Sequence, residues 1–294
     1  MPKKHNETET TERANREAAD FDAAWRSRPE AVYNHWTADR PANQIQLAFR
    51  RHWLLFKKLT KHAPNRRCLE AGCGRGSISS YFADDGFDAT LLDTSHAVLS
   101  TARNIFANNG HPASFVCGDA LKLPFPDATF GVVVSIGLLE HFEDVAPPLH
   151  EQIRVLAPGG TLLAYIVPDR VTPVQKAFKP VNSILKAVHG VFASDTEAAP
   201  AKQDIYRSDY RSAQYLPALR GQPVEEIRVI GMYPLPMVSH SPEFPFSLMS
   251  PVSEKLLSAA FEAALTARGA VTKHDPWVCG ERNGQAFLIT CKKF

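Results

Sequence analysis

The sequence has few of the features that mark secreted or membrane proteins. Its five cysteines form no CxxC pair, so we expect free thiols in a reducing compartment and no disulfide framework. No apolar run approaches the roughly 18 residues that a membrane span needs, and the N-terminal residues lack the apolar core of a signal peptide. We therefore expect a cytoplasmic protein without a transmembrane span.

A large excess of charge of one sign is also missing. Lysine and arginine number 33 against 31 for aspartate and glutamate, which gives a net charge of +2. A protein that neutralises many phosphates normally carries a basic patch or stripe, so we expect no nucleic-acid partner. The histidines and carboxylates show no metal-ligand spacing such as HxxxH, and we expect no metal site.

What the chain does contain is enough apolar sequence for a sizeable core and one glycine-rich stretch that organises it. With 294 residues and 44% hydrophobic composition, it fits a single α/β domain with insertions. In residues 68–76 a short apolar run breaks into Gly72, Gly74 and Gly76, and a helical pattern begins at Ser77. This pattern predicts a strand, a tight turn and a helix whose N-terminus favours a negatively charged group.

Further strand patterns follow at regular distances. They cover residues 87–92, 114–117, 130–136 and 161–167, with a helical pattern at 145–156 before the last of them. Asp93 closes the second strand about 20 residues after the first glycine, where an acid can accept the hydroxyls of a ribose. Asp119 follows the third strand, where a second carboxylate suits the amino group of an adenine. Strands that alternate with helices predict a doubly wound parallel sheet.

These motifs together resemble those of the class I S-adenosylmethionine (SAM) dependent methyltransferases, a group that includes the quinone-biosynthesis methyltransferases. The resemblance covers residues 67–169, through Glu-x-Gly-x-Gly-x-Gly at Glu70, Asp93, Gly118-Asp119-Ala120, Leu138-Leu139-Glu140-His141 and Leu156-x-Pro-Gly-Gly. It implies a Rossmann-like sheet of seven strands, the last antiparallel between the fifth and sixth, and SAM as the cofactor. The implied cofactor-binding residues are Glu70, Gly72, Gly74, Gly76, Asp93, Thr94, Asp119, Ala120 and Ile136.

An NAD site is the alternative for the glycine turn. The dinucleotide fingerprint places its third glycine or alanine where this chain has Ser77, and the spacing here is GxGxG. Asp93 would serve either ligand, whereas Asp119 and Glu70 favour SAM.

The rest of the chain surrounds this core. We expect a disordered tail at residues 1–20, a helical cap at 21–62, the SAM-binding core at 63–170, a lid insertion at 171–204, and the remaining sheet with a helical insertion at 205–294. Helices are predicted at 45–59, 180–189, 205–219 and 251–268, with Gly269 as the last stop signal, and strands at 224–232 and 286–291. Within the cap, Trp53 and Phe56 either pad the sheet or approach the ligand.

The predicted helix at 180–189 places Val181, Ile184, Leu185 and Val188 on one face and lysines on the other. An amphipathic face of this kind usually packs on its own protein, so we interpret it as a lid over the acceptor pocket. Contact with a membrane or a lipid-like substrate is the alternative.

The catalytic and substrate assignments follow from these placements. His141, just past the fourth strand, is a candidate general base; the simpler interpretation is that the Glu140-His141 pair only orders its loop. Asp169 ends the fifth strand and is a candidate to face the acceptor. The residues expected to line the acceptor pocket are Tyr33, Trp36, Phe178, Leu185, Tyr233, Phe244 and Phe246.

The predicted function is methyl transfer to a small, moderately apolar metabolite, as in secondary metabolism. Oxygen is the first choice of acceptor atom, with nitrogen, sulfur and carbon possible. Ser135-Ile136-Gly137-Leu138 replaces the Asn/Asp-Pro-Pro motif of nucleobase methyltransferases, which argues against nucleic-acid acceptors. The alternatives are a SAM-binding partner protein without transfer activity and an NAD-dependent oxidoreductase.

Overall fold

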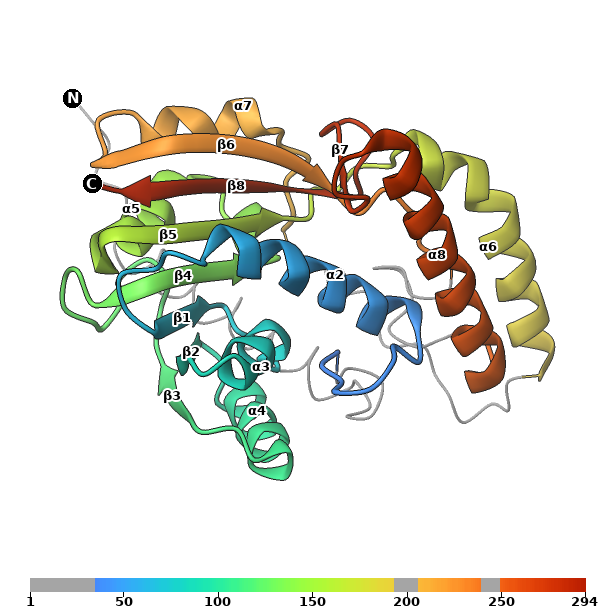
Figure 1. The fold of residues 1–294 in the computed structure, drawn as a ribbon, viewed down its shortest axis with the longest axis horizontal. Coiled ribbons are helices and arrows are strands. Elements are labelled where there is room, and N and C mark those ends of the chain that lie inside the picture. The colour runs from blue at the N-terminus through green and yellow to red at the C-terminus, as the bar shows by residue number, and fades with distance from the viewer. Residues whose placement is uncertain (1–34, 193–205, 239–248) are drawn as a thin grey trace, which may run out of the picture.

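The computed structural model describes residues 35–192, 206–238 and 249–294 (Figure 1). One sheet of eight strands, in the order β3-β2-β1-β4-β5-β8-β6-β7, forms the centre of this part of the chain. The strands are β1 (Arg67–Ala71), β2 (Asp88–Asp93), β3 (Ala113–Cys117), β4 (Phe130–Ile136), β5 (Leu156–Ile166), β6 (Val224–Met232), β7 (Val278–Cys279) and β8 (Ala286–Lys293).

Helices connect and cover the strands. They are α2 (Gln44–Leu59), α3 (Ser77–Asp84), α4 (His96–Asn109), α5 (Ala146–Val155), α6 (Pro173–Phe192), α7 (Ser212–Tyr215) and α8 (Pro251–Thr272), with short 3-10 helices η2 (Leu139–His141) and η3 (Leu216–Leu219). Local sequence explains several boundaries. In α4, for example, the Ser95 hydroxyl caps the N-terminus by accepting from the Val98 N–H, and Gly110 ends the helix in the left-handed conformation.

The strand arrangement confirms the predicted doubly wound, Rossmann-like class. Strands β1 to β5 pair in parallel, and β8 lies antiparallel between β5 and β6, as expected for the seventh strand. The predicted count of seven misses one strand, because the two residues of β7 pair antiparallel with the end of β6. A two-residue strand carries no alternating pattern that a sequence could show.

Both faces of the sheet are buried, which explains why the central strands read as continuous apolar runs. On one face α2 and α3 cover the sheet and α8 packs against α2, with a cluster that includes Trp53, Phe56, Phe82, Leu265 and Trp277. On the other face α5 and the α7–η3 segment contribute Leu149, Ile153, Tyr215 and Leu219. Trp53 and Phe56 therefore pack against the sheet, as the simpler of the two interpretations expected.

Two helix boundaries differ from the prediction. Helix α6 begins at Pro173, seven residues before the expected start, because the Thr172 hydroxyl accepts from the Gln175 N–H and supplies the N-terminal cap; Pro180 lies inside the helix. Helix α8 passes through Gly269 and ends at Lys273, which adopts the left-handed conformation. A Cβ at position 269 would meet the ring of Pro276 at 3.4 Å, an ordinary van der Waals contact, so packing there does not require a glycine, and the helix continues through it.

The expected helix over residues 205–219 is also shorter. Only Ser212–Leu219 is helical, in α7 and η3. Residues 206–211 before it are not helical, because the Ser208 backbone is bonded to the loops after β4 and β5: its N–H donates to Glu140 O at 2.8 Å, and its carbonyl accepts from the Asp169 N–H at 2.9 Å. These tertiary hydrogen bonds override the local helical pattern.

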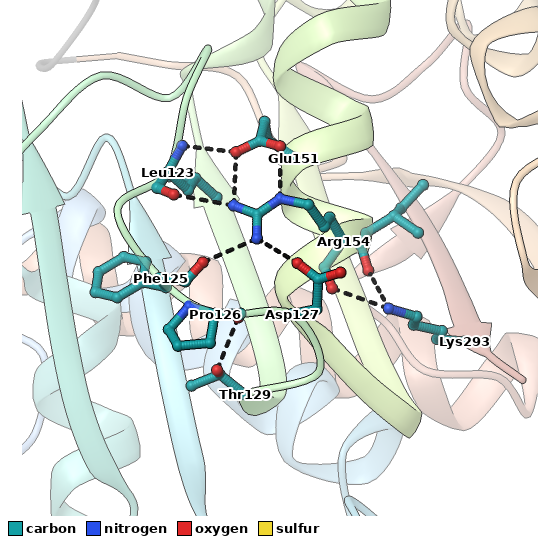
Figure 2. A network of polar contacts seen from close by, with 9 residues as sticks. Leu123, Phe125, Pro126, Asp127, Thr129, Glu151, Arg154 and Lys293 are labelled. Carbon is teal, nitrogen blue, oxygen red and sulfur yellow. Dashed lines mark hydrogen bonds and ion pairs between the residues drawn. The ribbon is translucent and has the colours of Figure 1, made fainter.

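At the amino end of β4, the Arg154 guanidinium ties α5 to the loop that leads into the strand (Figure 2). Its Nη1 donates to Phe125 O at 2.8 Å and to Asp127 Oδ1 at 2.7 Å, and its Nη2 donates to Leu123 O at 2.9 Å. Both oxygens of Glu151 accept from the same guanidinium, which lowers the pKa of that carboxyl. This network braces the scaffold at the edge of the sheet that lies opposite the glycine turn.

Among the described residues, no helix combines the length and the apolar character needed to cross a lipid bilayer.

Candidate functional site

The glycine turn after β1 and the acid at the end of β2 are joined directly. The Gly74 N–H donates to Asp93 Oδ2 at 3.0 Å, and the Ser95 N–H donates to Asp93 Oδ1 at 3.0 Å. Asp93 is half-buried at the carboxyl end of its strand. The two features that the sequence singled out therefore form one unit, with a carboxylate set between two turns.

The outer glycines are required by packing as well as by backbone conformation. Gly72, Gly74 and Gly76 all have positive φ, at 66°, 51° and 71°. A Cβ on Gly72 would lie 2.7 Å from Leu138 Cδ1, and one on Gly76 would lie 2.3 Å from Leu91 Cδ2. Leu138, from the loop after β4, thus rests on the glycine turn and couples the two loops.

Glu70 points from β1 onto the first turn of α3. Its Oε2 accepts from the Ser79 hydroxyl at 2.6 Å and from the Ser79 N–H at 3.1 Å. The side chain is buried, and this burial raises its pKa to about 8 against the opposing effect of the Ser79 hydrogen bonds. Glu70 therefore orients the turn and the helix behind it.

The third strand brings two more predicted residues to this edge. Asp119 is exposed, and its Oδ1 accepts from the Leu121 N–H at 2.8 Å, which shapes the loop after β3. Ala120 is buried beside it, and Thr94 is exposed just beyond Asp93. Since β3 and β2 are neighbours in the sheet, these residues lie along the carboxyl edge next to the Asp93 turn.

The loop after β4 brings Glu140 and His141 to the same edge of the sheet. Ile136 and Gly137 end the strand, and Glu140 is fully buried, with its Oε1 accepting from the Val167 N–H at 3.2 Å. Its Oε2 finds no hydrogen-bond partner among the described residues. Burial raises the pKa of Glu140 to about 7.

His141 follows, half-buried, and its Nδ1 lies 2.7 Å from the carbonyl oxygen of Tyr206. Because a carbonyl can only accept, Nδ1 carries the proton, and the lone pair of the neutral ring is on Nε2. The same segment, Tyr206 to Ser208, also contacts Asp169, which is exposed after β5, because the Asp169 N–H donates to Ser208 O. Residues 206–208 thus hold His141, Glu140 and Asp169 in place.

The predicted acceptor residues are not brought together in one group. Phe178 and Leu185 are half-buried on α6. Tyr233 is buried, stacked on Trp277 with ring centroids 4.8 Å apart, and burial raises its pKa. The indole N–H of Trp36 donates to Asp84 Oδ2 at 2.7 Å, at the far end of α3 from the glycine turn. Tyr33, Phe244 and Phe246 lie outside the described residues.

No pattern in the sequence predicts how residues 233–238, after β6, are held against the carboxyl edge. Gln44 of α2 donates to Pro236 O and accepts from the Val238 N–H. Gln175 of α6 exchanges two hydrogen bonds with Met237, at 2.9 and 2.8 Å. An isolated glutamine carries no sequence signal for such long-range pairing. Within the described ranges, no group of three side chains is arranged to hold a metal ion.

Comparison with known proteins agrees with this geometry. Residues 69–164 match the family model described as a methyltransferase domain. A protein of Mycolicibacterium smegmatis, named for S-adenosylmethionine-dependent methyltransferase activity, is 35% identical over 134 residues, which cover 46% of this chain and 50% of that protein. The ubiquinone/menaquinone biosynthesis C-methyltransferase of Vibrio parahaemolyticus is 28% identical over 169 residues, which cover 55% and 61%. The chain thus spans about half to three fifths of the length of these relatives.

The solved structure of the cyclase SpnF has the same fold. The match has a TM-score of 0.50 at 21% sequence identity and covers 88% of this chain and 86% of that one. The family match decides between the two cofactors that the glycine turn left open, because the family's methyl donor is S-adenosylmethionine. Residues 69–164 thus match a methyltransferase domain, and the sheet and the joined Gly74–Asp93 turn around them are consistent with that match.

Proposed function

We propose that the protein transfers a methyl group from SAM to a small-molecule acceptor at the carboxyl edge of its sheet. The observation that carries this proposal is the pairing of two loops. The Gly74–Asp93 unit after β1 and β2 lies beside the Glu140–His141 loop after β4, and Leu138 packs on Gly72 between them. Since β2, β1 and β4 are adjacent, a cofactor group and an acceptor group would meet there.

The residues present fit SAM. The turn offers bare main chain at three left-handed glycines, and a half-buried carboxylate closes it. We propose that Asp93 accepts from the ribose hydroxyls and that Asp119 faces the adenine amino group, with Thr94, Ala120 and Ile136 beside them. Glu70 acts through Ser79, by holding the turn and α3 in place.

When bound, SAM supplies a methyl group already activated on a sulfonium. The work left to the protein is to position the acceptor atom and to keep water away from it. The buried Glu140 and residues 206–208 support this role, because their hydrogen bonds fix the loop that carries His141. Asp169 lies at the other end of this group, bonded through its N–H to Ser208 O.

His141 is proposed as the general base. Its Nδ1–H donates to Tyr206 O, so Nε2 is the atom that would accept a proton from the acceptor. An imidazole of this kind suits a hydroxyl acceptor, and oxygen is therefore our first choice of methylated atom. A phenol with an apolar body would combine this group with the half-buried Phe178 and Leu185 of α6.

The test is incubation of the purified protein with labelled SAM and a metabolite extract, followed by mass spectrometry of the labelled products. A product methylated on oxygen supports the full proposal. Methylation on nitrogen, sulfur or carbon would keep the activity and reject the choice of atom. Tight SAM binding without any labelled product would favour a non-catalytic SAM-binding protein.

A further inference from the structure

Helix α6 turns polar side chains toward the protein. The Gln175 Nε2 donates to Met237 O at 2.9 Å, and the Asn182 Nδ2 donates to the same carbonyl at 2.8 Å. Gln285 also donates to Gln175 Oε1 at 3.2 Å. These amide hydrogen bonds, from positions two turns apart, fix which side of α6 faces inward.

The opposite side of α6 is apolar and exposed. It consists of Pro173, Ala177, Pro180, Val181, Ile184 and Ala187, all classed as exposed, and we call it the α6 stripe. Val181 is 41% exposed and Ile184 is 64% exposed. The spacing of four, three, one, three and three residues keeps these side chains on one face. The inward side of α6 also carries the half-buried Phe178 and Leu185, so the exposed apolar residues are additional to those that pack on the protein.

The charge on this helix has a single sign. Lys176 and Lys179 are exposed at the rim of the stripe, and the helix contains no aspartate or glutamate. Over the 15 residues from Pro173 to Ala187, the stripe is about 21 Å long. In Figure 1 α6 lies beyond the carboxyl ends of β4, β5 and β6, at the outer side of the molecule.

We propose that the α6 stripe binds the surface of an anionic lipid membrane. Val181 and Ile184 would enter the boundary between headgroups and acyl chains, while Lys176 and Lys179 contact the acidic headgroups. This combination of an exposed apolar stripe and a lysine rim is complementary to an anionic bilayer. A purely apolar partner surface would leave the lysines without counter-charges. Val181 and Ile184 are exposed and so do not form the covered face that the lid interpretation expected of them.

The test is flotation of the full chain with vesicles of phosphatidylglycerol and phosphatidylcholine, compared with vesicles of phosphatidylcholine alone. We expect binding to the anionic vesicles that weakens as salt rises. Ile184→Asp and Val181→Asp should each lower the bound fraction at least tenfold. Lys176→Gln and Lys179→Gln should each cost about fivefold. Val271→Asp is the matched control, because Val271 is an apolar residue of α8 that is 83% exposed.

Three results would overturn the proposal. One is no binding to anionic vesicles at low salt, and a second is an equal loss for Val271→Asp and Ile184→Asp. The third is a drop in unfolding temperature or a change in sedimenting mass for Ile184→Asp without vesicles. That result would mean that another part of this chain or a second copy covers the stripe. The lysine variants give a second test that does not depend on the apolar residues.

Discussion

The backbone N–H of Gly74 donates to the Asp93 carboxylate at 3.0 Å, which joins the turn after β1 to the end of β2. This contact holds the proposed ribose-binding acid at the centre of the site. It also means that Asp93 has two tasks, since removal of the carboxylate takes away a ligand contact and a constraint on the glycine turn. Variants at this position therefore need a control for folding.

We predict that Asp93→Ala weakens SAM binding by about 1.5–3 kcal/mol through loss of charge-assisted hydrogen bonds. Titration calorimetry with SAM and its demethylated product measures this. Asp88→Ala is the control, because Asp88 is exposed at the other end of the same strand and should not affect binding. Unchanged affinity in a folded Asp93→Ala protein would rule out the ribose assignment, and preferential binding of NAD would rule out SAM as the cofactor.

For His141→Ala we expect turnover to fall by roughly a hundredfold with SAM affinity unchanged, because a general base acts only in the chemical step. The control is His150→Ala. His150 also pairs with a backbone carbonyl, that of Ala218 at 2.8 Å, but it lies on α5. If His141→Ala instead loses SAM binding, the histidine serves to order its loop.

Glu70 should make the stability of the ligand-free protein depend on pH. Its folded pKa of about 8 lies above the usual 4.5, so between these pH values the folded state holds a proton that the unfolded state has released. Stability therefore falls as pH rises through this window, by about 1.4 kcal/mol per pH unit at most. Glu70→Gln removes this term, so its unfolding free energy relative to the wild type should rise from pH 5 to pH 8, as measured by denaturant titration.

Glu151→Gln is the control with the opposite sign. The pKa of Glu151 is lowered by Arg154, so its contribution is present above pH 4.5 and lost as pH falls below that value. Within the window from pH 5 to pH 8 the effect of Glu151→Gln should stay constant. A similarly flat difference for Glu70→Gln would show that Glu70 is ionised in the folded protein.

Two neighbouring residues of α6 should have separate effects on the acceptor. Leu185 is half-buried toward the protein, and Ile184 is 64% exposed on the other side. Loss of apolar contact in Leu185→Ala should raise the acceptor KM about tenfold or more, with SAM affinity nearly intact. Steady-state kinetics of Ile184→Ala, measured without membranes, should match the wild type. Equal KM values for both variants would remove α6 from acceptor recognition.

The sequence by itself determined the order of the elements and the cofactor edge. Local signals were sufficient there: the glycine spacing forces the left-handed turn, apolar runs identify buried parallel strands, and Asp93 ends such a run. All these signals lie within a few residues of the feature that they predict. The pairing of β8 between β5 and β6 has no such local signal and was expected from the family resemblance alone.

Only the tertiary structure decided which side of α6 faces inward, how deeply Glu140 is buried, and where Trp36 lies. The α6 pattern alone assigned Val181 and Ile184 to the covered face, but the hydrogen bonds from Gln175 and Asn182 to Met237 turn that face to solvent. The raised pKa of Glu140 likewise comes from the burial of its carboxyl in the folded protein. These properties depend on contacts between residues far apart in the chain, and such contacts leave no periodic mark in the sequence.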